Sequence, residues 1–475
     1  MILILFYIIL LFEIINGIWC LYRVIRYNNH NKKLKENNNE SKFENSKILI
    51  VIPCLREQDI IISTLQHFLK LTSNYENIKI LVVTTQKEEY EKEKYLYLQD
   101  DLKEDINNNT DIKKLITKYN KILSTMELKE ILKLKLNNNI DRIVEDIVKN
   151  SKTTSKIVEE YIKSRKLQDK VYHMHYPNNE GIMAEQLNYV LNNFDFIDES
   201  NYYYSVYNAD SIPSENTIKE ILNTIEKNKQ PEVIQQYSAP ISNWNDLSAI
   251  MKGFAIYQSN FELRYGLINS NIPNRLLYTY VVGHGMYIRV DVLKKIGGFE
   301  TKYWCEDIYM SYELRTKNIQ ICPIKTLELM QSPQYLSILT RQNAVWFKTS
   351  FECLKIFKDV YSKNKMINLN SLGWMIQRLR MNITWLGLPI AFLYTIIVAI
   401  LNQNIGILTV ATLTYLSMIL LEYGSIIRLL ENTSKIKLGN KFKILLYTTA
   451  ATTISNIGPI YSLISQKKEK YKTIR

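Results

Sequence analysis

Amide and carboxylate side chains close one of the predicted strands of this 475-residue chain. Asn208 and Asp210 end the segment YYYSVYNAD (202–210), which is apolar and tyrosine-rich as in a buried strand. Oxygen ligands two residues apart on such a turn suit Mg²⁺ or Mn²⁺, and a cation held there can bridge a diphosphate. The alternative is an ordinary turn or helix cap, for which Asn and Asp are also typical.

A pair of acidic residues begins a predicted helix. Glu306 and Asp307 follow the glycine-rich and aromatic segment GGFETKYWC (297–305). Acidic side chains commonly stand at a helix N-terminus because they offset the positive end of the helix macrodipole. The pair alone is therefore a weak indication of a site.

Two more groups of polar side chains are suited to binding. Arg56 and Glu57 directly follow the strand that ends at Pro53. A cluster of Arg, Gln and Trp, RQNAVW, occupies 341–346, where a packing Trp with solvated neighbours is the alternative.

The segments around these residues alternate between strand and helix patterns from residue 47 to about 350. Predicted strands are 47–53, 78–85, 171–176, 202–210 and 233–238, and predicted helices are 58–71, 183–194 and 214–228. Repeated strand–helix–strand units predict a doubly wound α/β sheet, whose ligands bind beyond the carboxyl ends of the strands. Residues 87–168, with apolar positions at helical spacing, predict a helical insertion. We favour a solvated helical excursion over a substrate-gating lid for this insertion.

Apolar runs at both ends of the chain predict membrane attachment. Residues 1–22 are long enough for one crossing, and basic residues follow them, which predicts an uncleaved anchor with domain 45–350 in the cytoplasm. The C-terminal membrane region, 383–464, would contain the apolar stretches 383–402, 405–427 and the less apolar 444–464. Residues 351–382 are expected as amphipathic or interface helices, and 465–475 as a basic tail.

Composition excludes several other classes. The formal net charge of +13 is spread along the chain and balanced by acids, without a recognition motif, so we expect no nucleic-acid partner. The five cysteines form neither a metal-ligand spacing nor a disulfide framework.

The order of these groups resembles the family 2 glycosyltransferases, in particular the membrane-embedded inverting synthases of cellulose, hyaluronan and poly-N-acetylglucosamine. The resemblance covers about 47–350 apart from the insertion, and implies a GT-A-like mixed sheet flanked by transmembrane helices. Its motifs match, in order, Pro53 to Glu57, Gly181 with Leu187 and Asn188, Asn208 to Asp210, Gly283-His284-Gly285, Gly297-Gly298-Phe299, Glu306-Asp307, and Gln342 to Trp346.

The resemblance also implies roles for single residues. Asp307 would be the catalytic base, supported by Glu306, and Asp210 would hold Mg²⁺ or Mn²⁺. The implied nucleotide-sugar site is Pro53, Glu57, Thr84, Gly181, Asn188, Asn208 and Asp210. The implied acceptor site is Gly283, His284, Gly285, Gln342 and Trp346. The expected activity is sugar transfer from a nucleotide-sugar donor to a lipid-linked or glycan acceptor at the inner cell membrane, for polysaccharide or glycolipid synthesis.

Several positions depart from the family pattern. Thr84 stands near the place of the uracil-contacting Asp, Asn208 replaces the first Asp of the metal motif, and Val345 replaces an Arg. Ile182 and Met183 stand where the family has a Lys. The alternative hypothesis is therefore a catalytically degenerate glycosyltransferase-like membrane scaffold. Processive synthesis, single transfer, and partner proteins of a synthesis or export complex all stay open.

Overall fold

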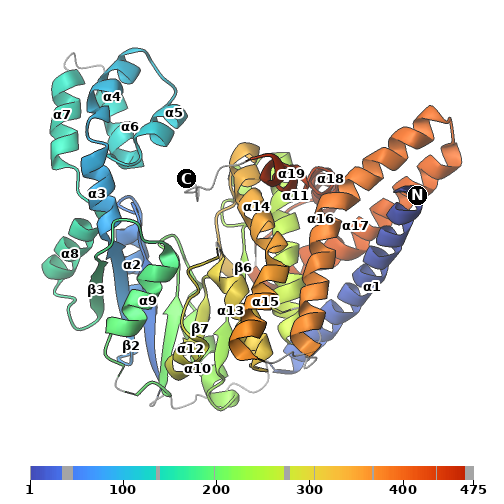
Figure 1. Cartoon of the computed structure of the whole chain (residues 1–475), viewed down its shortest axis with the longest axis horizontal. Coiled ribbons are helices and arrows are strands. Elements are labelled where there is room, and N and C mark those ends of the chain that lie inside the picture. Colours follow the sequence, from blue (N-terminus) through green and yellow to red (C-terminus); the bar gives the residue numbers. More distant parts are fainter. Residues whose placement is uncertain are drawn as a thin grey trace.

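Seven strands form one mixed sheet at the centre of the α/β body (Figure 1). The computed structural model describes residues 2–34, 46–134, 140–196, 198–271, 279–303, 305–365, 369–434 and 436–465. The sheet strands are β1 (Lys47–Pro53), β2 (Ile78–Thr85), β3 (Val171–Tyr176), β4 (Tyr202–Val206), β5 (Val233–Gln235), β7 (Met286–Arg289) and β8 (Ile321–Pro323). Their order is β3-β2-β1-β4-β7-β5-β8, and β7 runs antiparallel to both of its neighbours. The predicted α/β class with a mixed sheet is confirmed.

Helices cover both faces of the sheet, which explains why β1 is apolar along its whole length. Ile48, Ile50 and Ile52 of β1 face one layer, and Leu49 and Val51 face the other. The first layer contains α2 (Ile61–Leu71), α8 (Thr154–Arg165) and α10 (Thr217–Lys227). The second contains α9 (Met183–Asn193), α12 (Val290–Ile296) and α13 (Glu306–Thr316).

The chain turns to opposite sides of the sheet from β1. From β1 it proceeds to β2 on one side, while β4 pairs with β1 on the other, both in parallel. A doubly wound sheet opens a crevice at such a point, beyond the carboxyl ends of the two strands. The segments after Pro53 and after Val206 therefore lie at the edge of this crevice.

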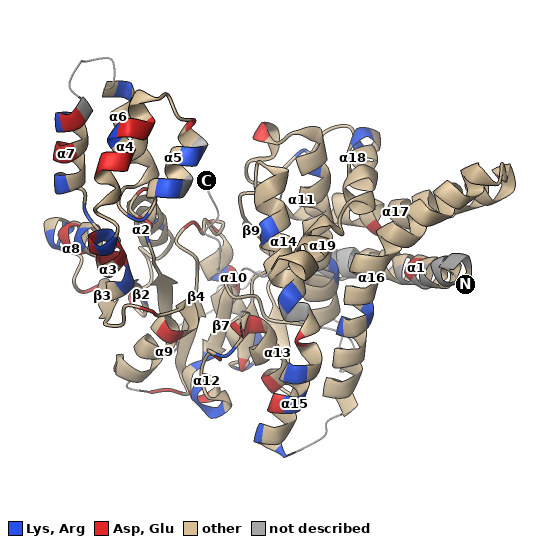
Figure 2. Ribbon diagram, turned by 45° about the horizontal axis from the view of Figure 1, so that its top comes forward, with Lys and Arg blue, Asp and Glu red and all other residues tan. Residues whose placement is uncertain are grey.

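A helical lobe separates β2 from β3. It comprises α3 (Gln86–Lys94), α4 (Leu98–Asn107), α5 (Ile112–Tyr119), α6 (Thr125–Leu134) and α7 (Ile140–Asn150), followed by α8. Helices α4 to α7 have an apolar core of their own, which includes Leu102, Leu115, Tyr119, Leu128 and Val144. Figure 2 shows many charged residues on these helices, as the Lys- and Glu-rich sequence of 87–168 suggests.

Most of the other described helices form a group beside the sheet (Figure 1). They are α1 (Ile2–Leu34), α11 (Ala249–Phe261), the π-helix η3 (Glu262–Ile268), α14 (Leu336–Phe351), α15 (Cys353–Asn364), α16 (Leu369–Leu401), α17 (Ile405–Ser434), α18 (Lys441–Thr453) and α19 (Ile457–Ile464). Three short elements complete the described chain. Along the sequence, β6 (Ser238–Ala239) and η2 (Trp244–Asp246) precede α11, and β9 (Glu328–Leu329) precedes α14. Strand β6 pairs with β9.

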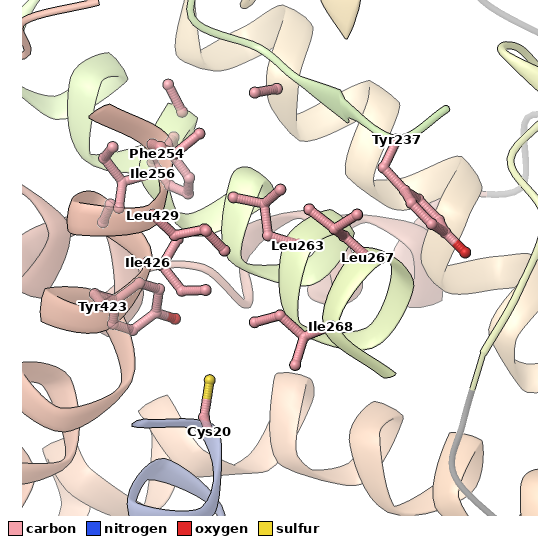
Figure 3. Close-up of a cluster of buried hydrophobic side chains, with 14 of the residues drawn as sticks. Cys20, Tyr237, Phe254, Ile256, Leu263, Leu267, Ile268, Tyr423, Ile426 and Leu429 are labelled. Atoms are coloured by element: carbon pink, nitrogen blue, oxygen red, sulfur yellow. The ribbon is translucent and has the colours of Figure 1, made fainter. Parts of the chain in front are cut away.

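Apolar side chains hold the helical group together. Figure 3 shows Leu263 and Ile268 of η3, Ile426 of α17 and Cys20 of α1 in one buried cluster. Helix α1 packs along α17 and α16. Helices α16 and α17 are long and apolar enough to cross a membrane.

The helical region differs from the sequence-based boundaries in two respects. The last part of the expected interface region 351–382 and the expected span 383–402 form one continuous helix, α16, and Trp374 and Arg378 are buried against protein. Trp374 packs edge-on against Tyr312 of α13, with ring centroids 4.4 Å apart. Residues 444–464 form parts of two short helices, α18 and α19, which pack against α11 and α14. The basic tail, 466–475, lies outside the described residues.

Candidate active site

The turn after β4 presents Asn208 and Asp210 to a cavity of about 990 Å³. The strand ends at Val206, so the polar pair lies in a turn and not in the expected strand 202–210. Two hydrogen bonds fix this turn: Asn208 N–H donates to Ser211 Oγ (3.0 Å), and Ser211 N–H donates to the Asn208 carbonyl (3.0 Å). Thr64 of α2 donates a further hydrogen bond to the Ala209 carbonyl. The turn therefore has little freedom to move the Asp210 carboxylate.

Glu306 and Asp307 line the same cavity from the start of α13. The Asp307 carboxylate accepts backbone hydrogen bonds from Gly283 N–H at Oδ2 (3.2 Å) and from Ile308 N–H at Oδ1 (2.8 Å). Burial raises the pKa of Asp307 above its ordinary value, and this effect outweighs the two hydrogen bonds, which lower the pKa. A fixed carboxylate with a raised pKa is suited to accept a proton from a hydroxyl group.

The segment Gly283-His284-Gly285 contacts Asp307 on one side and the residue after β5 on the other. Gly283 N–H donates to Asp307, and Gln236 N–H donates to the Gly285 carbonyl. A Cβ atom on Gly283 would lie 3.3 Å from Glu306 Oε1, so the glycine leaves room for that carboxylate. Gly285 has φ +65°, and a Cβ atom there would lie 2.6 Å from the Gln236 carbonyl oxygen. Gly285 therefore has a structural reason to be glycine, whereas Gly283 and His284 line the cavity.

His284 lies near several carboxylates, and two of them, Glu328 and Glu262, were not predicted as site residues from the sequence. His284 Nδ1 lies 2.9 Å from Oε2 of the fully buried Glu328 in β9. Burial alone would lower the pKa of His284, but the carboxylates of Glu328, Glu262 and Asp210 raise it to about 9.

Glu262 is the second acidic side chain that the sequence did not reveal. It begins the π-helix η3, lines the cavity, and burial raises its pKa to about 7. Asp307 raises this pKa further, while His284 lowers it. No sequence pattern pointed to Glu262 or Glu328, because each is a single acidic residue within an otherwise ordinary helix or strand segment.

Helix α14 provides another wall of the cavity. Gln342 and Trp346 lie one helical turn apart on it, and both line the cavity together with Arg341 and Val345. Trp346 is 41% exposed, so part of its indole side chain is accessible to solvent. Asp210, Asp307, Gln342 and Trp346 thus share one cavity.

The cavity continues between the long apolar helices. Its lining there includes Asn382, Trp385 and Leu388 of α16, and Met418 and Glu422 of α17. The two helices that could cross a membrane therefore contribute directly to the cavity that holds Asp307.

The remaining predicted site residues are not among the described residues that line the cavity; they are Pro53, Glu57, Thr84, Gly181, Asn188 and Gly285. Thr84 Oγ1 is within hydrogen-bond distance of His173 Nε2 (2.8 Å) and His175 Nδ1 (2.9 Å). Glu57 N–H donates to Thr154 Oγ1 (2.9 Å) at the start of α8.

Asn188 and Gly181 have contacts that explain their residue types. Asn188 Nδ2 donates to the Phe299 carbonyl (2.7 Å), and Phe299 N–H donates to Asn188 Oδ1 (2.8 Å). This pair of hydrogen bonds holds the Gly297-Gly298-Phe299 turn, which directly follows α12. A Cβ atom on Gly181 would lie 2.3 Å from the ring of Tyr176, so a larger residue there would require this ring to shift.

The side-chain oxygens of Asn208 and Asp210, in the turn after β4, are suited to a divalent cation that binds together with a phosphate-bearing substrate. Asn208 and Asp210 offer one amide and one carboxylate oxygen, and Mg²⁺ is commonly held by one or two carboxylates together with substrate phosphate oxygens. Among the described residues, no group of three or more His, Cys, Asp or Glu side chains is placed to hold a metal ion.

Comparison with known proteins gives no family assignment. No family model matches the sequence, and no curated protein matches it. The structure is similar to a mannosyltransferase, PcManGT from Pyrobaculum calidifontis, in complex with GDP-Man and Mn²⁺ (11% identity, TM-score 0.46, covering 98% of this chain and 99% of that chain). It is also similar to S. aureus TarS 1–349 in complex with UDP (9% identity, TM-score 0.37, covering 90% and 95%).

Proposed function

We propose that this protein is a membrane-bound inverting glycosyltransferase of the family 2, GT-A type. It would move a hexosyl or N-acetylhexosaminyl group from a nucleotide-sugar donor to a lipid-linked or glycan acceptor. The observation that carries the proposal is that Asp210 and Asp307, on elements far apart in the sequence, line one cavity together with Gln342 and Trp346.

The donor would bind at the crevice beside β1 and β4. Asp210 and the Asn208 amide would hold a divalent cation against the diphosphate, and this cation would stabilise the negative charge of the departing nucleotide. The hydrogen-bonded turn at 208–211 supports this role because it holds both side chains in the cavity.

Asp307 would act as the general base toward an acceptor hydroxyl. Its carboxylate is fixed by Gly283 and Ile308, and burial raises its pKa, so it is a better proton acceptor than a solvated Asp. General base assistance of this kind contributes roughly 10²–10⁴ in rate. Attack by one hydroxyl in line with the leaving group inverts the configuration of the anomeric carbon.

The acceptor would enter from the helical side. Trp346 and Gln342 supply a stacking surface and an amide beside Asp307, and the cavity continues to α16 and α17. Continuity with two apolar helices supports a membrane-associated acceptor and a multi-pass location, with the α/β body in the cytoplasm.

A catalytically degenerate scaffold is the second candidate. It is favoured by Asn208 at the first position of the metal motif and by Met183 and Val345, whose side chains line the cavity where the resemblance leads us to expect cations. The two candidates differ in one property: only the enzyme would consume a nucleotide sugar.

The test is nucleotide-sugar consumption by purified full-length protein in detergent with Mg²⁺ or Mn²⁺. We expect Asp307→Asn to abolish sugar transfer while nucleotide binding changes little. Asp195→Asn is the matched control, because Asp195 is exposed and does not line the cavity. Wild-type turnover by Asp307→Asn would remove Asp307 from the role of base. Absence of turnover by the wild type with every nucleotide sugar tried would favour the scaffold.

A further inference from the structure

The helical insertion forms one wall of the cavity. Ile112, Ile116 and Asn120 follow one another at intervals of four residues along α5, so they share one face of that helix, and all three line the cavity. Lys121, just after α5, and Lys129 of α6 line it as well. In Figures 1 and 2, α5 is the insertion helix nearest to α14, and residues of both helices line the cavity. We call these five residues the insertion face.

Two buried or partly buried carboxylates attach the insertion to the loop that follows β1. Glu88, at the start of α3, accepts hydrogen bonds from Arg56 N–H (2.9 Å), Gln58 Nε2 (2.9 Å) and Thr154 N–H (2.7 Å). The Glu88 side chain thereby connects the loop after β1, the beginning of the insertion and the beginning of α8.

Asp59 makes the second attachment. Its carboxylate accepts hydrogen bonds from the backbone N–H groups of Thr125 (3.0 Å) and Met126 (3.3 Å) at the start of α6. The α6 helix, which carries Lys129, is thus capped by a residue of the loop beside the donor crevice. These contacts argue for an insertion that is held against the site, contrary to the solvated excursion expected from the sequence.

The charges on the two sides of the cavity are complementary to a phosphate-bearing ligand. The charged residues that the insertion contributes to the lining are both basic, Lys121 and Lys129. On the α/β side, the lining includes the carboxylates Asp210, Glu306 and Asp307, together with Arg56 of the loop after β1. Lys121 Nζ lies 4.0 Å from the ring centroid of Tyr95, and this cation–π contact limits the positions of its ammonium group.

We propose that the insertion face binds the phosphate groups of a substrate through Lys121 and Lys129, with Asn120 as an additional hydrogen-bond donor. This inference rests on the proposed function, which supplies a nucleotide diphosphate as one source of phosphate and a phosphorylated lipid acceptor as the other. In both cases the carboxylates opposite are left to bind a cation or a hydroxyl group.

The experiment compares two lysine pairs within the same insertion. The test variant is Lys121→Gln with Lys129→Gln, and the matched control is Lys114→Gln with Lys133→Gln, since these two lysines are exposed and do not line the cavity. Each full-length protein in detergent is titrated with UDP and GDP in the presence of Mn²⁺, and separately with a polyprenyl monophosphate. A melting curve establishes that each variant is folded.

We expect the test variant to bind one phosphate ligand about tenfold more weakly or worse, because two charge-assisted contacts are lost. We expect the control to stay within about twofold of wild type, as for exposed charges. Weaker nucleotide binding would identify the diphosphate as the ligand, and weaker polyprenyl phosphate binding alone would identify the acceptor. Unchanged binding of both ligands would overturn the inference.

A second variant guards against misfolding, and one comparison separates this inference from the proposed function. Lys129→Glu alters one exposed side chain and reverses its charge. It should therefore weaken phosphate binding relative to wild type without affecting folding. If the wild type transfers sugar and Asp307→Asn does not, but every lysine variant matches the control, only the role of the insertion face is refuted. If the wild type binds neither nucleotide, the proposed function fails first.

Discussion

The backbone N–H of Gly283 donates a hydrogen bond to Oδ2 of Asp307 over 3.2 Å. The two residues stand on different elements, the segment before β7 and the first turn of α13. The second oxygen of the carboxylate, Oδ1, is held by the N–H of Ile308. The segment around Gly283 thus positions the proposed base, although its backbone carries no reactive group.

Alanine substitutions at the two nearby glycines should therefore have different effects. In Gly283→Ala the new methyl group would lie 3.3 Å from Glu306 Oε1 and 3.8 Å from Asp307 Oδ2, so we expect transfer to fall while stability changes little. In Gly285→Ala the residue must keep φ +65° and the methyl group meets the Gln236 carbonyl, which should cost about 1–3 kcal/mol of stability. Melting curves and transfer rates of both variants check this. Equal loss of stability in the two variants would contradict the prediction.

Stability should depend on pH through His284. The carboxylates around it, chiefly Glu328, outweigh burial and raise its pKa in the folded protein to about 9, above the value of about 6.5 in an unfolded chain. Protonated His284 therefore stabilises the fold fully below about pH 6.5, and this stabilisation is lost as the pH rises toward 9.

The measurement is the melting temperature of wild type and His284→Gln between pH 6 and pH 9.5. The wild-type melting temperature should fall across this range, and the variant should fall less. Glu262, whose pKa burial raises to about 7, stabilises the fold in its protonated form. This stabilisation is lost as the pH rises from about 4.3 to 7, below most of the range in which His284 acts, so the two effects are separable. Parallel curves for the two proteins above pH 7 would contradict the prediction.

Asn188→Ala should destabilise the protein. It removes both hydrogen bonds to Phe299, and the loss of such buried contacts typically costs about 1–3 kcal/mol. The control is Asn193→Ala on the same helix, where the exposed side chain donates to the Tyr189 carbonyl of its own helix (2.8 Å). Melting temperatures and nucleotide affinities of both variants are measured. A lower affinity at unchanged stability would instead support Asn188 as a nucleotide-binding residue.

The ion pair between Glu13 of α1 and Arg380 of α16 should hold the two helices together. The Glu13 side chain is 6% exposed and that of Arg380 is 33% exposed, so removal of Arg380 leaves a buried carboxylate unpaired, which costs up to about 3–5 kcal/mol. We expect Arg380→Gln to lower the melting temperature in detergent. The double variant, Glu13→Gln with Arg380→Gln, should recover part of the loss because no charge is left unpaired. If the melting temperature of the double variant falls by the sum of the decreases in Glu13→Gln and Arg380→Gln, the two residues are not coupled.

Asn208→Asp should increase the affinity for the divalent cation. The substitution adds a second carboxylate oxygen donor two residues from Asp210, at the turn that lines the cavity. We expect half-maximal transfer at a lower Mn²⁺ concentration, by about tenfold, which corresponds to about 1.4 kcal/mol. Asn245→Asp, an exposed change outside the cavity lining, is the control. An unchanged Mn²⁺ requirement would argue against a metal at this turn.

Much of the α/β body could be predicted from the sequence. The unbroken apolar runs at 47–53 and 78–85 are what strands buried on both faces require, and both form neighbouring strands of the sheet. Polar residues that follow such runs, Asn208 and Asp210 among them, could be expected at one edge of the sheet. The reason is that parallel strands all end at the same edge. Local pattern sufficed there.

The acidic residues buried beside the cavity could not be predicted in this way. Glu262 and Glu328 are single carboxylates in a helix and a strand, and nothing in their neighbouring residues distinguishes a buried carboxylate from a solvated one. Glu328 is fully buried beside His284, whereas Glu262 is half-buried at the start of η3, and both environments are formed by elements that are distant in the sequence. The continuity of α16 was missed for a related reason, since Trp374 and Arg378 pack against α13 and α11 and not at a water interface.

The sequence by itself determined the α/β class and the apolar character of the terminal helices, because both follow from the local spacing of apolar residues. Only the tertiary structure decided that Asp210, Asp307 and Trp346 share one cavity and that the insertion forms one of its walls. The physical reason is that these relations depend on long-range contacts, such as the hydrogen bonds of Glu88 and Asp59, whose partners lie 30 or more residues away. Spacing along the chain does not encode such contacts.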